Sequence, residues 1–325
     1  MSDAVIQVEN LVRKFKDLTA VRGVSFQVAR GEVFGFLGPN GAGKSTTIKM
    51  LATLLKPTAG RALINGYDVV RQQDRVRRSI GLVFQDPSLD ERLTARENLF
   101  FHAMLYNVES RVFKRRMQEM VEMVELTDRL NDPVKYFSGG MKRRLEIARG
   151  FLHYPQVLFL DEPTVGLDPQ TRSKIWEYIH ALRQRENITI FMTTHYMEEA
   201  ENCHRIAIID HGEIVAMDTP ANLKKLVGGD IITILTTRAG EMADRLAERF
   251  GLRAAGQGNI LRVEVEQGEA FIPLLVREMG EDIKSVTLHK PSLDDVFLKL
   301  TGREIREESV SAVDRIRVFR RGRRR

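Results

Sequence analysis

The stretch from Gly38 to Thr46 has the residue types and spacing of a phosphate-binding loop. It fits the pattern G-x-x-x-x-G-K-[ST] and lies between an apolar run at 33–37 and the segment 48–51. In such a loop, backbone N–H groups and the positive end of the following helix form a nest for phosphate oxygens. Lys44 would reach the β- and γ-phosphates, and Ser45 would bind Mg²⁺. We interpret the stretch as a nucleotide site rather than a glycine-rich turn without a ligand. The residues expected to contact the nucleotide are Gly38, Pro39, Asn40, Gly41, Ala42, Gly43, Lys44, Ser45 and Thr46.

Two acidic residues, Asp161 and Glu162, follow a second apolar run at 157–160. A run that is apolar on both faces is typical of a central strand in a parallel sheet, where ligands bind at the carboxyl ends of the strands. Asp161 would then hold Mg²⁺ through water, and Glu162 would polarise the attacking water. A strand end without chemistry is the weaker alternative, because burying two carboxylates without a cation is costly.

Other polar and aromatic residues lie where they would complete such a site. Gln85 ends a predicted strand at 81–84 and would place water or metal, although a single Gln signals little. His195 ends a predicted strand at 188–194 and would reach the γ-phosphate, although a lone His is usually structural. Ser138 is a suitable N-cap, and Gly139 and Gly140 behind it leave the N–H groups of a helix start open to an anion.

Phe15, a short way upstream of the phosphate loop, has two readings of about equal weight. It is either a buried aromatic or a platform on which adenine stacks.

The order of predicted elements is that of an α/β protein with a smaller second unit. Antiparallel strands are expected at 5–8 and 24–28, and a hairpin at 203–217 closes the first unit. Helical periodicity runs from 94 to 126, with a methionine-rich stripe expected to be core. The apolar residues of that stripe are Leu99, Met104, Leu105, Met117, Met120, Met123 and Val124. Further helices are expected at 142–152 and 170–185.

Beyond residue 229 the pattern changes to strand, helix, strand, helix, strand. These elements are expected at 231–237, 241–250, 260–265, 269–279 and 283–288, an order compatible with a small ferredoxin-like α+β unit. A short helix at 292–300 is expected to pack back on the body. We find no catalytic constellation after Met217, which favours a regulatory or docking role for this unit.

Bulk properties limit the remaining choices. The chain has 325 residues, 43% of them hydrophobic, and no window approaches the roughly 18 to 20 apolar residues of a membrane span. The single cysteine, Cys203, excludes an intrachain disulfide and indicates a cytoplasmic protein.

The net charge of +6 comes from residues 310–325, which hold seven arginines and Asp314. That tail would contact anionic lipid or nucleic acid, or be a solvated disordered end, which is the favoured reading.

Taken together, these residues resemble the ATP-binding subunit of ABC transporters over residues 4 to 225. The resemblance identifies Gly38–Thr46 as Walker A and Val157–Asp161 as Walker B, with Glu162 as catalytic glutamate. It also assigns family motifs to further residues: the Q-loop to Gln85, the D-loop to Asp168, the switch histidine to His195 and the signature element to Ser138, Gly139 and Gly140.

The sequence departs from the family pattern at three positions. Phe137 stands where Leu is usual, Met141 where Gln is usual, and Phe15 where Tyr is common. Phe15 can still stack on adenine, whereas Met141 cannot hydrogen-bond a ribose.

A narrower resemblance, to the daunorubicin-resistance type of drug-export ATPase, extends over residues 4 to about 302. It is carried by the runs Asp161–Arg172, Thr194–Glu201 and Lys290–Phe297. The resemblance implies a P-loop ABC ATPase domain at 1–225, with a mixed sheet core, an antiparallel β subdomain and a helical subdomain at about 90–152. A C-terminal α+β regulatory or docking domain at 226–302 and a basic tail at 303–325 would follow.

The resemblance also implies a mechanism and partners. ATP and Mg²⁺ are the cofactors, and Glu162, His195, Lys44 and Gln85 the catalytic residues, with Ser45, Gln85 and Asp161 at the metal. Two copies would form a head-to-tail homodimer with ATP between Lys44 of one copy and Ser138 of the other.

A separate integral membrane permease would carry the cargo, with this chain peripheral on the cytoplasmic face of the membrane. Gln85 and the helices at 94–126 would contact that permease. A lipid or polysaccharide exporter is the main alternative. An ATPase acting on nucleic acid is disfavoured, because such proteins generally carry two ATPase units or a long coiled-coil insertion.

Overall fold

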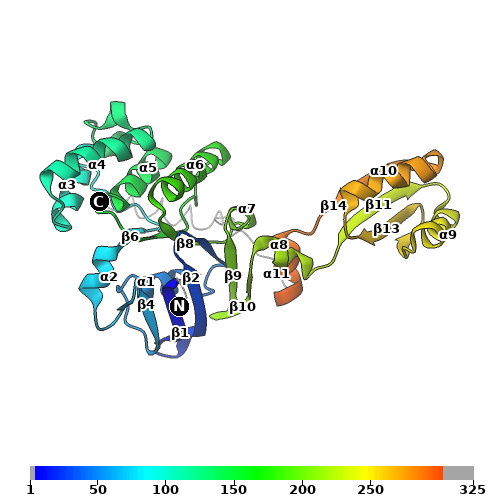
Figure 1. The fold of residues 1–325 in the computed structure, drawn as a ribbon, viewed down its shortest axis with the longest axis horizontal. Coiled ribbons are helices and arrows are strands. Elements are labelled where there is room, and N and C mark those ends of the chain that lie inside the picture. The colour runs from blue at the N-terminus through cyan, green and yellow to red at the C-terminus, as the bar shows by residue number, and fades with distance from the viewer. Residues whose placement is uncertain (1–3, 303–325) are drawn as a thin grey trace, which may run out of the picture.

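The computed structural model describes residues 4–302, and its centre is a six-stranded sheet in the order β10-β9-β3-β8-β7-β6 (Figure 1). Five strands run parallel, and β10 pairs antiparallel with β9 at one edge. The bounds of the strands are β3 (Val33–Leu37), β6 (Ile80–Val83), β7 (Val157–Asp161), β8 (Thr189–Thr194), β9 (Arg205–Asp210) and β10 (Glu213–Asp218).

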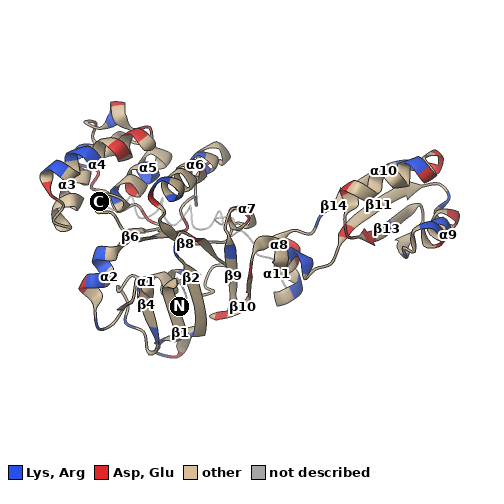
Figure 2. Ribbon diagram, viewed as in Figure 1, with Lys and Arg blue, Asp and Glu red and all other residues tan. Residues whose placement is uncertain are grey.

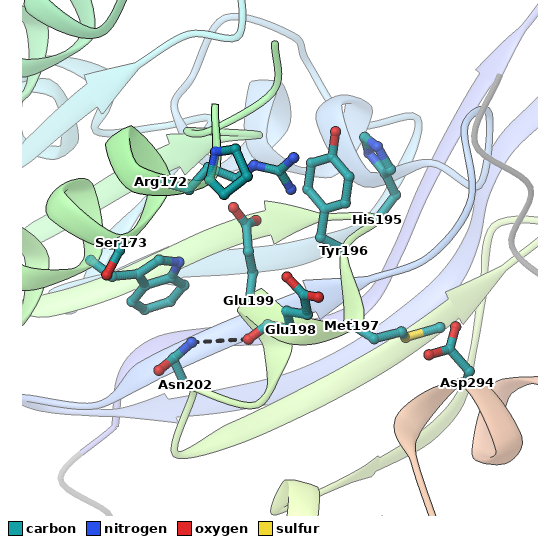
Figure 3. A pocket seen from close by; sticks show the side chains of 11 residues that line it. Arg172, Ser173, His195, Tyr196, Met197, Glu198, Glu199, Asn202 and Asp294 are labelled. Atoms are coloured by element: carbon teal, nitrogen blue, oxygen red, sulfur yellow. Dashed lines mark hydrogen bonds between the residues drawn. The ribbon is translucent and has the colours of Figure 1, made fainter. Parts of the chain in front are cut away.

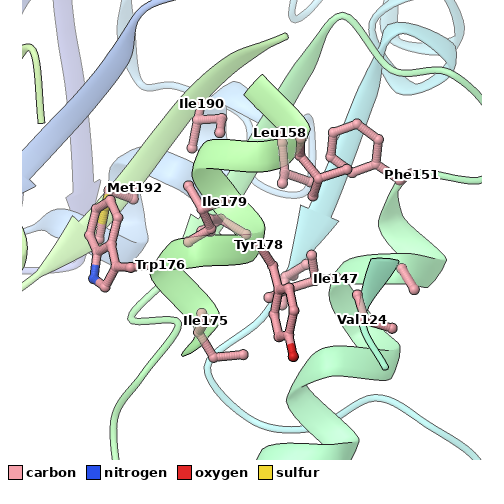
Figure 4. Packing of buried hydrophobic residues seen from close by; sticks show 14 of the residues in the cluster. Val124, Ile147, Phe151, Leu158, Ile175, Trp176, Tyr178, Ile179, Ile190 and Met192 are labelled. Carbon is pink, nitrogen blue, oxygen red and sulfur yellow. The ribbon is translucent and has the colours of Figure 1, made fainter. Parts of the chain in front are cut away.

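The central strands are apolar on both faces because a different layer covers each face. Phe34 and Phe159 point into a core shared with α1 (Lys44–Leu51) and the antiparallel sheet. Leu158 and Ile190 point into the opposite core, against α5 (Gly139–Gly150) and α6 (Pro169–Glu186) (Figure 4). Alternate residues therefore serve opposite cores, as the pleat of a strand requires.

A second sheet lies on the α1 side and has the order β2-β1-β4-β5. It confirms the predicted antiparallel strands near the N-terminus, which are longer than expected. The bounds of its strands are β1 (Ala4–Phe15), β2 (Leu18–Ala29), β4 (Ala59–Ile64) and β5 (Tyr67–Asp68).

The predicted helical region 94–126 is two helices rather than one. α3 (Ala95–Leu105) and α4 (Ser110–Met123) are separated at Asn107, whose φ of 52° is left-handed. The expectation that the apolar stripe is core was wrong for Met104 and Leu105, which are 56% and 80% exposed. These two residues lie in the last turn of α3, just before the chain reverses, where no layer covers them.

The remaining helices of the first unit differ from the expected bounds by a few residues. The helix expected from residue 142 begins at Gly139, because the Ser138 side chain accepts a hydrogen bond from Met141 N and caps the helix there. Three short helices were not predicted from the sequence: α2 (Gln73–Ser79), α7 (Met197–Ala200) and α8 (Pro220–Lys225).

Residues 230–289 form a separate α+β unit that projects from the first (Figure 1). Its sheet order, β12-β13-β11-β14, is antiparallel throughout, and its helices share a core of their own with it. This is the expected ferredoxin-like arrangement with one strand, β12, that the sequence did not predict. The bounds are β11 (Asp230–Thr236), α9 (Ala239–Phe250), β12 (Ala254–Gln257), β13 (Ile260–Val265), α10 (Gly268–Met279) and β14 (Ile283–His289).

The last described helix, α11 (Leu293–Thr301), returns to the first unit as predicted. Leu293, Val296 and Phe297 are buried in the same core as Leu223 of α8. Lys299 Nζ also donates a hydrogen bond of 2.7 Å to the carbonyl of Leu226.

Charged residues lie mainly along the outer helices, and the central strands carry few (Figure 2). Within residues 4–302, none of the helices is long and apolar enough to cross a bilayer. The arginine-rich tail predicted at 303–325 lies outside the described residues.

Candidate nucleotide site

The predicted phosphate loop connects β3 to α1 at the carboxyl edge of the central sheet. Gly43, which precedes the helix, has a φ of 105°, and a Cβ built there would lie 2.6 Å from the carbonyl oxygen of Ala20. Only glycine fits this position without strain. Gly43 therefore allows the tight turn from β3 into α1 that a phosphate-binding loop makes.

Lys44 is buried and holds the loop closed on itself. Its Nζ donates hydrogen bonds of 2.7 Å to the carbonyl of Gly38 and 3.1 Å to that of Pro39. The same Nζ lies 3.1 Å from Glu162 Oε1, and only 4% and 5% of the two side chains is exposed. Burial lowers the pKa of Lys44, while the nearby Glu162 carboxylate acts in the opposite direction.

Glu162 is held in an uncommon backbone conformation, with a φ of 47°. Its N–H donates both to the carbonyl of Thr193, at 3.2 Å, and to Thr193 Oγ1, at 3.1 Å, which compensates for that strain. Burial would raise the pKa of the Glu162 carboxyl, but His195 and Lys44 outweigh it and hold the pKa below its usual range. Glu162 is therefore an anion at neutral pH.

Asp161 connects the acidic strand end to the phosphate loop. Its Oδ1 accepts hydrogen bonds of 3.0 Å from Ser45 Oγ and 2.6 Å from Thr193 Oγ1. A carboxylate oxygen and a hydroxyl oxygen side by side are donors that Mg²⁺ prefers. The pair thus fits the predicted metal position.

His195 follows β8 directly and faces the same edge. Its Nδ1 lies 3.4 Å from Glu162 Oε1, close enough for electrostatic attraction but without the geometry of a hydrogen bond. Lys44, Ser45, Asp161, Glu162 and His195, which the sequence predicted separately, are therefore neighbours in the structure.

Gln85 is connected to this group through the backbone. Its side chain is exposed, and its carbonyl accepts a hydrogen bond of 3.2 Å from Arg143, a buried residue of α5. The same guanidinium donates to the carbonyls of Phe84 and Glu162, at 2.5 and 3.2 Å. Sequence reasoning missed Arg143, because a basic residue on a basic helix gives no signal of burial.

The other predicted contacts lie apart from this group. Phe15 is 40% exposed at the end of β1, and Arg13 lies over its ring at 4.4 Å. Ser138 caps α5, whose first residues are Gly139 and Gly140. Asp168 caps α6 by accepting a 3.0 Å hydrogen bond from Thr171 N. Within the described residues, the Ser138 hydroxyl accepts a hydrogen bond from Met141 N of its own helix.

The sequence of the chain matches a known protein family and several named relatives. The family described as ABC transporter matches residues 21–165. The daunorubicin resistance ATP-binding protein DrrA3 of Streptomyces coeruleorubidus is 39% identical over 308 residues, covering 93% of this chain and 97% of that protein. The chain belongs to the ABC transporter ATP-binding protein family.

Two other relatives of this ABC ATPase match as widely. The linearmycin resistance ATP-binding protein LnrL of Bacillus subtilis is 38% identical, with 93% of this chain and all of that protein covered. The Nod factor export ATP-binding protein I of Burkholderia thailandensis is 39% identical, with 94% and 100% covered.

Solved structures agree with the fold. An ATP-binding subunit of an ABC transporter aligns with a TM-score of 0.63 at 31% identity, over 68% of this chain and 92% of that one. A dimeric ATP-binding cassette in a post-hydrolysis state, bound to ADP and Pi, aligns with a TM-score of 0.60 at 28% identity, over 66% and 98%. The P-loop fold with its mixed and antiparallel sheets is therefore confirmed. The protein is an ABC ATPase that hydrolyses ATP for transport.

Proposed function

We propose that this chain is the energy-coupling ATPase that powers export of drugs or other hydrophobic compounds through a separate membrane permease, from the cytoplasmic face of the membrane. The observation that carries the proposal is the contact of Lys44 and Ser45 with Glu162 and Asp161 at one sheet edge. Relatives named for daunorubicin and linearmycin resistance support a drug as cargo. A relative named for Nod factor export makes another exported compound, such as a lipid or polysaccharide, the second candidate.

Within the site, each residue has a role that follows from its position. Lys44 would leave Glu162 to bind the β- and γ-phosphates, and Glu162 would then orient the attacking water in line with the γ-phosphate. His195, beside Glu162, would contact the γ-phosphate from the other side. Ser45, Asp161 and Gln85 would hold Mg²⁺, which when bound neutralises charge on the phosphate oxygens.

ATP would also join two copies of the chain. Cassettes of the family dimerise, as the dimeric post-hydrolysis structure shows for its own chain. The capped start of α5 offers backbone N–H groups and the Ser138 hydroxyl, and its first turn carries no acidic residue that would neutralise the positive end of the helix. We therefore place each ATP between Lys44 of one copy and Ser138 of the other, in a homodimer, with Asp168 at the same interface.

The permease would contact the end of α3. Four large apolar side chains there are exposed: Phe100, Phe101, Met104 and Leu105. Exposed apolar patches of this kind mark interaction sites. Arg143 connects the neighbouring α5 to the backbone of Gln85 and of Glu162, so a movement at this surface would reach the catalytic edge.

The test is ATP turnover of the purified chain, alone and after reconstitution with the membrane protein encoded beside it. We expect the permease to stimulate turnover, and a hydrophobic cationic drug to stimulate it further. Stimulation by a lipid or polysaccharide but not by a drug would favour the second candidate. If the membrane protein leaves ATP turnover unchanged and DNA or RNA stimulates it, the transport function is contradicted.

Adenine stacking on Phe15 predicts a selective loss of ATP affinity in F15A. Removing an aromatic platform costs about 1–3 kcal/mol per base, so the Kd for ATP should rise roughly 5- to 150-fold. F15Y, which keeps the ring, is the matched control and should stay near the wild-type Kd. Equilibrium binding of ATP and of inorganic triphosphate separates the outcomes, because only ATP carries the base. Equal weakening of both ligands would show that Phe15 acts on the loop and not on adenine.

A further inference from the structure

Glu199 is a buried acid on α7 that none of the predicted roles uses. It is 4% exposed, although it lies in a helix of only four residues. It lines a surface cavity of about 610 Å³ together with Arg172, His195 and Tyr196 (Figure 3). A buried carboxylate requires partners, so its contacts show what it does.

The two carboxylate oxygens of Glu199 accept hydrogen bonds from two different segments. Oε1 accepts from Thr164 Oγ1, which lies two residues after Glu162. Oε2 accepts from Thr194 Oγ1 at 2.5 Å, and Thr194 immediately precedes His195. Thr194 Oγ1 in turn accepts from Tyr196 N at 2.9 Å. One carboxylate therefore bridges the segment that carries the expected catalytic base and the segment that carries the expected γ-phosphate contact.

Bridging by a carboxylate is directional. An ionised carboxylate only accepts, so both threonine hydroxyls must point toward it. A protonated carboxyl or an amide presents a donor to one of the hydroxyls, which must then reverse. When the Thr194 hydroxyl reverses, its proton loses the carboxylate as acceptor, and its oxygen must accept from Glu199 as well as from Tyr196 N. The charge state of Glu199 is thus coupled to the hydrogen bonds of the segment that carries His195.

We propose that Glu199 is a positioning residue that keeps Glu162 and His195 in the relative placement needed for hydrolysis, and that it does so only while ionised. The proposal rests on the roles given above to Glu162 and His195. Glu199 touches neither of these side chains in the structure and acts through Thr164 and Thr194.

The electrostatic surroundings make this bridge sensitive to pH near neutrality. Burial raises the pKa of Glu199 to about 7, against the opposing effects of the Thr194 hydrogen bond, Arg172 and His195, while Glu162 acts in the same direction as burial. Arg172 is held nearby by its stacking over the ring of Tyr196, at 4.5 Å. A change of one pH unit therefore changes the fraction of ionised Glu199 substantially.

The test compares E199Q with E198Q, in the full chain, by kcat and KM for ATP between pH 6 and 9. Glu198 is the exposed neighbour on the same helix, so E198Q removes the same charge outside the bridge. Wild type and E198Q should lose roughly 3- to 10-fold in kcat between pH 8 and 6, with an unchanged KM. At pH 8, the kcat of E199Q should be at least about 5-fold lower than that of wild type, with a KM within about twofold of the wild-type value. The kcat of E199Q should also lack the acid limb, which is the fall in kcat between pH 8 and 6.

Thermal unfolding separates positioning from folding. In the folded protein Glu199 keeps its proton up to about pH 7, whereas in the unfolded chain the same carboxyl has lost it above about pH 4.5. The contribution of Glu199 to the free energy of unfolding therefore falls as the pH rises from about 4.5 to 7. E199Q should therefore have a Tm at pH 8 no lower than that of wild type. A drop in kcat with a higher or equal Tm is the expected combination.

T164V provides a second, independent variant. It removes one hydroxyl from the bridge and keeps the side-chain shape, so Glu199 loses a hydrogen bond to its ionised form and its acid limb should shift to higher pH. If E199Q and T164V both keep the wild-type kcat and acid limb while E162Q is inactive, the positioning role is wrong. If E162Q is itself active, the proposed function of the site fails instead.

Discussion

Replacing Glu162 by glutamine is expected to lower steady-state ATP turnover at least about 10²-fold, as loss of a general base does, while ATP binding persists. The side chain keeps its size, and the left-handed backbone at this position is held by Thr193 and not by the carboxylate. The variant should therefore fold normally. Phosphate release under saturating Mg-ATP measures the turnover.

The effect of this substitution on ATP affinity follows from the ion pair with Lys44. In the structure, Lys44 Nζ lies 3.1 Å from Glu162 Oε1, so ATP must displace the carboxylate before its phosphates can bind the lysine. E162Q removes that competitor. ATP should thus bind at least as tightly as to wild type, by equilibrium dialysis. Near-normal turnover in E162Q would remove Glu162 from the role of base, whereas loss of both binding and turnover would point to a damaged loop.

Mixing two inactive variants is expected to restore ATP hydrolysis. If each ATP lies between Lys44 of one copy and Ser138 of the other, K44A and S138R homodimers have no intact site. A heterodimer of the two has one intact site, formed by Lys44 of the S138R chain and Ser138 of the K44A chain. An equal mixture forms half heterodimers, so about one quarter of the wild-type sites return in a two-fold dimer.

ATP turnover of the mixture should be at least about tenfold higher than that of either variant alone. Removing the cation of Lys44, or blocking the donors at Ser138 of the other copy, costs several kcal/mol of transition-state stabilisation. The matched control is the double variant K44A/S138R mixed with wild type, whose heterodimers have both sites damaged and should only lower activity. A mixture of the single variants that stays inactive, in the presence of dimers by light scattering, would contradict the shared site.

The meeting of these polar side chains at one edge of the sheet was predictable because each of their segments carries a local signal. Asp161 and Glu162 follow a strand that is apolar on both faces, and Lys44 lies in a loop with the spacing of a phosphate-binding loop. Parallel pairing then brings the strand ends together, a consequence of topology that the sequence expresses through its alternating strands and helices.

What the sequence did not predict has a physical reason in each case. Arg143 contacts Gln85 and Glu162, and Glu199 contacts Thr164, across long stretches of chain, and a buried charge looks like any surface charge until the fold is known. The strand β12 (Ala254–Gln257) consists of two alanines, a glycine and a glutamine, without the apolar alternation that marks a strand. The break at Asn107 depends on a single left-handed residue, which asparagine adopts only in some contexts.

The return of α11 to the first unit gives the ferredoxin-like unit two attachment points instead of one. The chain leaves the ATPase core after α8 and re-enters it at α11, and these two helices pack on each other through Leu223, Val296 and Phe297. In topological terms the unit is an inserted domain and not a C-terminal appendage. Two connecting segments limit rotation of the unit relative to the ATPase core, whereas a single linker would allow that rotation. A force on this unit would therefore reach the core as a torque on the α8–α11 pair, and Asp294 of α11 lines the same cavity as His195.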